Sequence, residues 1–293
     1  MQKWQQIDQE ISKKLGESFV SSSHRPVGGG CINEAYSISD GNQTFFVKLN
    51  STNMAPMFVA EAAGLQEIID STSVRAPKPV CWGATVDHSY IVMESLALGG
   101  NSTGAGAILG QQLALMHKKT SDQFGWKMNN TIGSTPQPNT YNENWLTFYG
   151  ESRLAYQLEL AAKNGCDASL TDKGNKLLDL FHYFFTNYAP RPSLLHGDLW
   201  SGNVAVLTSG QPTIFDPAVY YGDREADLAM TELFGGFGQP FHDAYNETWP
   251  LDPGYSTRKT LYNLYHILNH FNLFGGAYGA QAERMVEQLL SEI

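Results

Sequence analysis

Three polar residues, Asp198, Asn203 and Asp216, have the types and the spacing of a phosphoryl-transfer site. The asparagine follows the first aspartate by five residues, and the second aspartate follows the asparagine by thirteen. In kinases the first aspartate of such a set accepts the proton of the attacking hydroxyl, while the asparagine and the second aspartate hold Mg²⁺ ions. These ions neutralise charge on the transferring phosphoryl group. The pattern therefore indicates a catalytic loop followed by a metal-binding aspartate.

Short apolar runs flank these polar residues. Residues 194–195, 204–207 and 213–215 are predicted strands, and residues 208–211 supply a turn. The three polar groups are thus expected at strand ends in one hairpin. The alternative is an ordinary hairpin in which Asp and Asn serve only as turn formers. The other parts of a kinase must therefore be found elsewhere in the chain.

Lys48 interrupts an otherwise apolar, β-rich run at residues 45–49, where a lysine would normally lie at a strand edge or point outward. Glu61 follows thirteen residues later, in a predicted helix over residues 56–70. A strand lysine and a glutamate of the next helix form the kinase ion pair that positions the α- and β-phosphates. The alternative for Glu61 is a solvated helix face.

A glycine-rich turn precedes Lys48 and leads into a predicted strand. Glycine lets backbone amides approach phosphates closely because it adds no side chain. Gly28, Gly30 and Asn33 imitate G-x-G-x-x-G, with asparagine in the last place; the alternative is a plain turn. The candidate nucleotide-binding residues of this turn are Gly28, Gly29, Gly30, Cys31, Ile32 and Asn33.

The first part of the chain is rich in predicted strands and the second part in predicted helices. A linker follows the predicted strand 89–94, and in a kinase such a linker offers backbone groups to the adenine, here from Met93, Glu94 and Leu96. We therefore expect an ATP-binding lobe at 1–95, a hinge at 96–103 and a helical lobe with the catalytic hairpin at 104–293. The fold class is α+β, with two lobes as in protein kinases.

The helical part contains one long segment without helical periodicity. Residues 120–141 are rich in Pro, Asn, Gly and Thr, and their length predicts either a functional loop or a mobile one. His117, in the helix before this segment, is expected to be structural. The predicted helices lie at 104–119, 142–163, 172–188, 223–234, 256–274 and 277–292.

Composition excludes several classes of protein. The length of 293 residues suggests about two domains. A formal net charge of −10, from 19 basic and 29 acidic residues, disfavours nucleic acid or an anionic membrane as a partner. The three cysteines are too few and too scattered for a disulfide framework or a zinc site. Without an apolar signal core or a long apolar segment, the chain is expected to be cytoplasmic.

The kinase-like parts occur in the order of a protein kinase, but the details differ from that family. Gly197 stands where the Arg of His-Arg-Asp would be, Pro217 and Ala218 replace the Phe-Gly of Asp-Phe-Gly, and no Ala-Pro-Glu follows. This pattern resembles the aminoglycoside phosphotransferase and choline kinase branch of the protein-kinase-like superfamily. Members of that branch phosphorylate small hydroxyl compounds.

Within that branch, residues 195–203 and 215–230 are similar to the signature of the fructosamine kinase family, as are residues 28–33 and 46–48. The resemblance implies ATP- and Mg²⁺-dependent phosphorylation of the sugar 3-hydroxyl of ketoamines, which form when sugars glycate lysines. The product decomposes and frees the amine, which amounts to protein deglycation and repair. Microbial and plant relatives generally favour ribulosamines over fructosamines, so ribulosamine is the expected substrate.

The resemblance also implies roles for single residues. Asp198 would be the general base or would orient the hydroxyl, Asn203 and Asp216 would bind Mg²⁺, and Lys48 would bind the ATP phosphates. Glu61 would orient Lys48. Two further residues have less specific roles: Trp200 would stack on the ketoamine sugar or simply pack, and Asp227 would support the catalytic loop through backbone hydrogen bonds.

Cys31 in the glycine-rich loop carries a separate hypothesis. Unpaired backbone N–H groups in such a loop favour a thiolate, and the resemblance implies redox sensitivity there. Oxidation of Cys31, or a disulfide between two chains, would then switch activity off, in a monomer or a redox-sensitive homodimer. The alternative is a small residue with no redox role.

Two other functions remain open from the residues alone. The first is another small-molecule kinase of the same fold, acting on an aminoglycoside, choline or a free sugar. The second is a non-catalytic nucleotide-binding module. The run 213–236 argues against the first, and the presence of Lys48, Asp198, Asn203 and Asp216 argues against the second.

Overall fold

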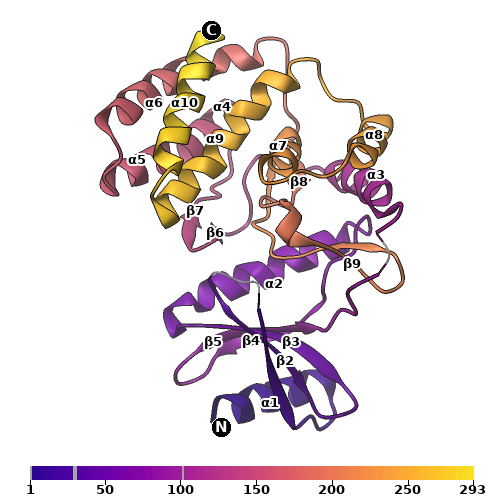
Figure 1. The fold of residues 1–293 in the computed structure, drawn as a ribbon. Helices are drawn as coiled ribbons and strands as arrows, with labels where there is room; N and C mark the ends of the chain where they lie inside the picture. The colour runs from indigo at the N-terminus through magenta and orange to yellow at the C-terminus, as the bar shows by residue number, and fades with distance from the viewer. Residues whose placement is uncertain (1, 29–31, 101) are drawn as a thin grey trace. The chain divides into compact units, whose positions relative to one another are not determined.

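The structure is a computed structural model that describes residues 2–28, 32–100 and 102–293 (Figure 1). The chain forms two compact units, the first from Met1–Ala105 and Ala205–Pro217 and the second from Gly106–Val204 and Ala218–Ile293. The segment Ala205–Pro217, which the prediction places in the helical lobe, thus belongs to the strand-rich first unit. The hinge at 96–103 stays a prediction.

The first unit is built on a five-stranded antiparallel sheet in the order β1-β2-β3-β5-β4. A separate two-stranded ladder pairs β9 with β10. The elements are α1 (Gln2–Leu15), β1 (Ser23–Val27), β2 (Glu34–Ser39), β3 (Thr44–Asn50), α2 (Ala55–Asp70), β4 (Pro79–Ala84), β5 (Ser89–Glu94), β9 (Val204–Val206) and β10 (Pro212–Ile214).

Alternation along β3 determines which way Lys48 points. Successive side chains of a strand project to opposite faces of the sheet. Val47 packs in a hydrophobic core with Ile7 and Ile11 of α1. Lys48 therefore points to the other face, and α1 and α2 lie on opposite sides of the sheet (Figure 1). This arrangement lets Glu61 of α2 reach the lysine.

The second unit is mainly helical, with the long helix α9 in its core. Every residue of α9 from Leu261 to Asn269 is buried, and the helix packs against α5, α7 and α10. The elements are α3 (Ala105–His117), β6 (Asn130–Ile132), β7 (Thr135–Gln137), α4 (Trp145–Tyr149), α5 (Tyr156–Lys163), α6 (Ala168–Leu180), β8 (Ser193–Leu195), β11 (Tyr220–Gly222), α7 (Glu225–Leu233), α8 (Gln239–Thr248), α9 (Tyr255–Phe274) and α10 (Tyr278–Ser291). In the ranges that the structure describes, no helix is both long and apolar enough to cross a bilayer.

Several predicted elements differ from those observed. The predicted loop 120–141 contains the hairpin β6–β7, and α8 and β11 were not predicted. The predicted helix 142–163 is interrupted by a π-helical segment at Gly150–Ala155. The predicted helix 172–188 begins earlier, at Ala168, because the Asp167 side chain caps it by accepting the Ser169 N–H.

Candidate active site

Lys48 forms two ion pairs within the first unit. Its Nζ atom lies 2.6 Å from Glu61 Oε1 and 2.5 Å from Asp216 Oδ1. Burial by itself would lower the pKa of Lys48, but the charges of Asp216 and Glu61 raise it above its ordinary value, so the lysine is a cation. Burial raises the pKa of Glu61, and Lys48 opposes this effect. The structure thus brings together three of the predicted site residues.

Asp216 follows β10 in a backbone conformation that few residues adopt. Its φ angle is +58°, in the left-handed region, which aspartate tolerates better than most side chains. The preceding strand is fixed because Thr213 and Ile214 both donate hydrogen bonds to the Arg75 carbonyl, at 3.0 and 2.9 Å. Strained backbone held by its surroundings concentrates at functional sites, which supports a functional role for Asp216.

Asp198 and Asn203 are joined directly in the second unit. The Asn203 side-chain amide donates to the Asp198 carbonyl at 2.8 Å and to its Oδ2 at 3.1 Å. Asn203 is buried and Asp198 is half-buried. The bond to Oδ2 orients the Asp198 carboxylate, and the bond to the carbonyl fixes the backbone of this residue. Both bonds use the nitrogen of the Asn203 amide and do not involve its oxygen.

Asp227 anchors the backbone of the loop that contains Asp198. Its carboxylate accepts the N–H groups of His196 and Gly197, at 2.7 and 2.8 Å, and contacts His117 Nε2 at 3.1 Å. Burial by itself would raise the pKa of Asp227. These hydrogen bonds and the nearby histidines lower it, and the net result is a pKa below the ordinary value. The predicted structural roles of Asp227 and His117 are confirmed.

Gly197 is required at its position for two reasons. Its φ angle is +83°, and a Cβ atom there would lie 2.1 Å from the Ala218 carbonyl oxygen. Ala218 in turn donates its N–H to the His196 carbonyl at 2.8 Å. The backbone next to Asp198 therefore passes so close to residue 218 that only glycine fits.

Tyr245 of α8 extends the Asp227 network and was not predicted. Its hydroxyl lies 2.8 Å from His117 Nδ1 and accepts a hydrogen bond from Arg224 at 3.3 Å. The ionised Asp227 carboxylate can only accept hydrogen bonds, so His117 Nε2 carries a proton, and in the neutral imidazole Nδ1 then accepts the Tyr245 hydroxyl proton. Sequence spacing offered no signal for this relay, because 128 positions separate His117 from Tyr245.

The hairpin β6–β7 supports the segment that follows Asp216 in the chain. Gln137 donates to Asn130 Oδ1 at 2.8 Å and to the Ala218 carbonyl at 3.1 Å. Asn130 donates to the Val219 carbonyl at 2.8 Å. These amides are buried, so the stretch that the sequence leaves as a functional or mobile loop includes an ordered scaffold.

The predicted nucleotide-binding segments lie in the first unit. Residues 28–33 connect β1 to β2, and Asn33 Oδ1 accepts a hydrogen bond from Asn50 at 2.7 Å. Gly29, Gly30 and Cys31 lie outside the described residues. Met93 and Glu94 end β5, with Leu96 just beyond it. Nucleotide binding by all these residues, and the redox role of Cys31, stay predictions.

Asn203 of the second unit and Asp216 of the first unit are the predicted magnesium ligands, and magnesium binding by them stays a prediction. Mg²⁺ in proteins is commonly held by one or two carboxylates together with substrate phosphates. In the described part of the chain, no group of three or more His, Cys, Asp or Glu residues could hold a metal by itself. An amide oxygen and a carboxylate fit a metal that arrives with a nucleotide.

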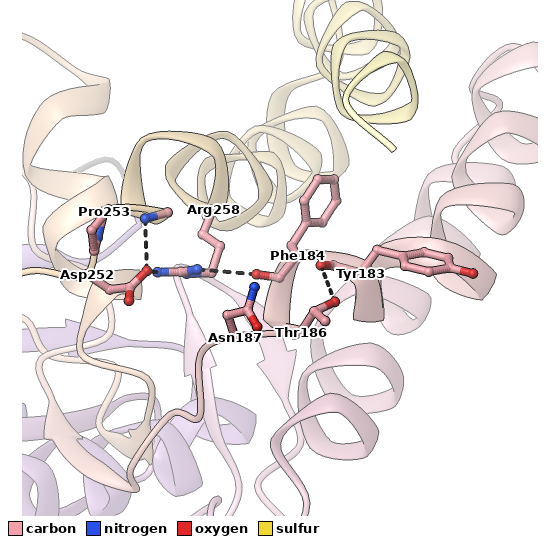
Figure 2. A pocket seen from close by; sticks show the side chains of 8 residues that line it. Tyr183, Phe184, Thr186, Asn187, Asp252, Pro253 and Arg258 are labelled. Atoms are coloured by element: carbon pink, nitrogen blue, oxygen red, sulfur yellow. Dashed lines mark hydrogen bonds and ion pairs between the residues drawn. The ribbon is translucent and has the colours of Figure 1, made fainter.

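A cavity of about 360 Å³ in the second unit is a separate feature (Figure 2). Arg258 crosses it, paired with Asp252 and donating to the Phe184 carbonyl. Glu225 also binds this guanidinium, so the cation is already neutralised. The lining includes Tyr183 and Asn187 but none of the predicted site residues, and the cavity is therefore not a candidate for catalysis.

Comparison with known proteins places the chain among kinases. A family model for fructosamine kinase matches residues 3–292. The chain belongs to the fructosamine kinase family. It is 49% identical over 292 residues to a probable ketoamine kinase of Synechocystis, covering 98% of this chain and 97% of that one. It is 46% identical over 267 residues to the chloroplastic protein-ribulosamine 3-kinase of Arabidopsis thaliana, covering 90% and 81%. The protein is therefore a kinase.

Solved structures agree with this fold. A Haemophilus somnus protein provisionally assigned as a fructosamine-3-kinase has a TM-score of 0.90 at 29% identity, with 98% and 97% of the chains covered. A choline kinase from Streptococcus pneumoniae has a TM-score of 0.66 at 14% identity, with 99% of both chains covered. An aminoglycoside phosphotransferase solved with ADP and hygromycin B has a TM-score of 0.65 at 16% identity, with 97% and 98% covered. The α+β kinase-like fold is confirmed.

Proposed function

We propose that this kinase phosphorylates the 3-hydroxyl of the sugar in ketoamines attached to lysine, using ATP and Mg²⁺, with ribulosamine preferred. The observation that carries the proposal is the pair of Asn203 hydrogen bonds that orient Asp198. Identity of 46% with a plant protein-ribulosamine 3-kinase supports the choice of substrate. The product decomposes and frees the lysine amine, so the activity would be protein deglycation.

Asp198 is the proposed acceptor of the hydroxyl proton. A carboxylate aligned with the attacking oxygen increases its nucleophilicity as the bond to phosphorus forms. The alignment comes from both sides of the loop, because Asn203 holds the carboxylate and Asp227 holds the backbone amides of His196 and Gly197. Phosphoryl transfer depends mostly on such positioning and on charge neutralisation.

Lys48, Asn203 and Asp216 are the proposed nucleotide and metal ligands. Lys48 is a fixed cation that would bind the phosphates, and Glu61 keeps it in place. The oxygens of Asn203 and Asp216 would hold Mg²⁺, which when bound neutralises charge on the phosphoryl group. Trp200, exposed near Asp198 in the loop, would stack on the sugar.

ADP formation with four acceptors tests the proposal. N-ribulosyl-lysine, N-fructosyl-lysine, choline and kanamycin are compared with wild type and Asp198→Asn. We expect turnover with the two ketoamines, faster with the ribulosyl compound, and near-complete loss in Asp198→Asn. Turnover with choline or kanamycin alone would contradict the substrate class, and near-normal activity of Asp198→Asn would contradict the role of Asp198.

A further inference from the structure

A continuous row of aromatic rings leads from the catalytic loop to the last two helices. Trp200 contacts Phe234 with ring centroids 6.5 Å apart, and Phe234 contacts His270 of α9 at 4.7 Å. His270 also contacts Phe274, at 5.7 Å, and Tyr278 of α10, at 5.1 Å. These five residues are called the aromatic row. Trp200 and Phe274 at its two ends are 38% and 55% exposed.

The end of the row at the catalytic loop is held in place by its neighbours. A Cβ atom on Gly202 would lie 2.3 Å from atoms of the Trp200 ring, so the indole lies across a residue that has no side chain. The Ser201 hydroxyl donates to the Phe234 carbonyl at 3.3 Å, which ties the loop to the end of α7. The Trp200 ring is therefore both exposed to solvent and fixed by its neighbours, which makes it available to contact a ligand.

The centre of the row carries no charge at neutral pH. The His270 Nδ1 atom lies 2.8 Å from the His266 carbonyl, so Nδ1 carries the proton that it donates there. Burial lowers the pKa of His270 below its ordinary value, which keeps the ring neutral. A neutral aromatic surface attracts ammonium groups through its π faces and also accepts aliphatic chains.

We propose that the aromatic row binds the amine half of the substrate, meaning the secondary ammonium and the lysine side chain that carries the sugar. This inference rests on the proposed function. In a ketoamine the nitrogen is bonded to C1, two carbons from the reacting C3 hydroxyl. If that hydroxyl lies at Asp198 and the sugar stacks on Trp200, the ammonium on C1 lies at the edge of the same ring, and the lysine stem and its peptide extend along the row toward Phe274. The enzyme would then favour ketoamines on lysine of a polypeptide over ketoamines of small amines.

The test compares two substrates with the same sugar. One is a capped peptide with a central Nε-ribulosyl-lysine, and the other is ribulosyl-methylamine, which lacks the lysine stem. The readout is the ratio of their kcat/KM values. In Phe274→Ser this peptide preference should fall roughly 2- to 5-fold, the size of one exposed cation–π contact. Phe274→Tyr keeps the ring and should preserve the ratio.

Tyr183→Ser is the matched control, since Tyr183 is also 55% exposed but lines the separate cavity of Figure 2. Its peptide preference should equal that of wild type. An unchanged ratio in Phe274→Ser, or an equal fall in Tyr183→Ser, would overturn the inference while wild type still phosphorylates ketoamines. Failure of wild type on both ketoamines would instead overturn the proposed function and this inference with it.

Discussion

Lys48 and Asp216 form an ion pair although 168 positions separate them in the sequence. Lys48 is the proposed phosphate ligand and Asp216 the proposed metal ligand, and in this structure they bind each other. On binding of a nucleotide, Lys48 would exchange Asp216 for a phosphate and keep Glu61, its buried partner. The Lys48–Glu61 pair is therefore expected to matter for stability as well as for activity.

Replacing Lys48 by methionine should destabilise the protein and abolish turnover. The change leaves Glu61 buried without a cation, and breaking a buried pair in this way costs about 3–5 kcal/mol. Urea denaturation gives the free energy of unfolding. The double variant Lys48→Met/Glu61→Leu removes both charges and should regain much of the stability while staying inactive.

Lys13→Met is the control for this comparison, because Lys13 pairs with Glu10 on the exposed surface of α1. Exposed pairs contribute little, so its unfolding curve should match wild type. Equal stability of wild type and Lys48→Met would contradict the structural importance of the buried pair.

Asp227→Asn should lower kcat by about 10- to 100-fold with little change in the KM for ATP. An amide cannot accept both loop N–H groups as the carboxylate does, so Asp198 would lose its fixed position. Steady-state kinetics measures this effect. Asp243→Asn on the exposed side of α8 is the control, and an Asp227→Asn enzyme with wild-type kcat would refute the anchoring role.

Tyr245→Phe tests the relay that reaches the catalytic loop through His117. In wild type, ¹⁵N NMR of the imidazole should find the His117 proton on Nε2, as its contacts with Tyr245 and Asp227 require. The variant leaves Nδ1 without its hydroxyl partner, which should shift that signal and cost about 1–3 kcal/mol of stability. The fall in kcat should be smaller than in Asp227→Asn. An unaltered His117 spectrum would argue against the relay.

His266 should make the protein less stable as the pH falls. Burial lowers the pKa of this histidine to about 3, and its Nδ1 has no hydrogen-bond partner among the described residues. Between its ordinary pKa of about 6.5 and the folded value, the unfolded chain binds more protons than the folded protein. The free energy of unfolding should therefore be unaffected by His266 above pH 6.5 and should decrease as the pH falls toward 3. The slope would reach about 1.4 kcal/mol per pH unit.

The variant His266→Gln removes this titration but keeps a polar side chain of similar size. Urea denaturation of both proteins between pH 7 and pH 4 gives the two slopes. We expect the stability of the variant to depend less on pH across this range. Parallel curves for the two proteins would show that His266 does not titrate as the structure implies.

Local patterns in the sequence were enough to predict the parts of the site. The kinase pattern of a strand lysine and a glutamate of the next helix predicts the contact between Lys48 and Glu61. Strand ends with turn residues predict the hairpin that carries Asp198, Asn203 and Asp216. Each of these features depends on neighbouring residues. These local patterns do not predict the ion pair of Lys48 with Asp216, which lies 168 positions further along the chain.

Features that depend on distant contacts were missed. The scaffold of β6 and β7 is stabilised by bonds to residues 218–219, more than 80 positions away, so its local sequence resembles a loop. Helix α8 follows a glycine-rich stretch and was not predicted. The contact of its Tyr245 with His117 was therefore not predicted either. The left-handed backbone of Asp216 was not predicted either, because aspartate is common in ordinary backbone conformations as well.

The most direct test of the central claim is to follow N-ribulosyl-lysine with ATP and Mg²⁺ by ³¹P NMR and amine analysis. We predict phosphate on the sugar 3-hydroxyl, followed by release of free lysine in the same molar amount as ADP, and neither product with Asp198→Asn. Phosphorylation at another hydroxyl, or ADP formed without lysine release, would contradict the proposed deglycation.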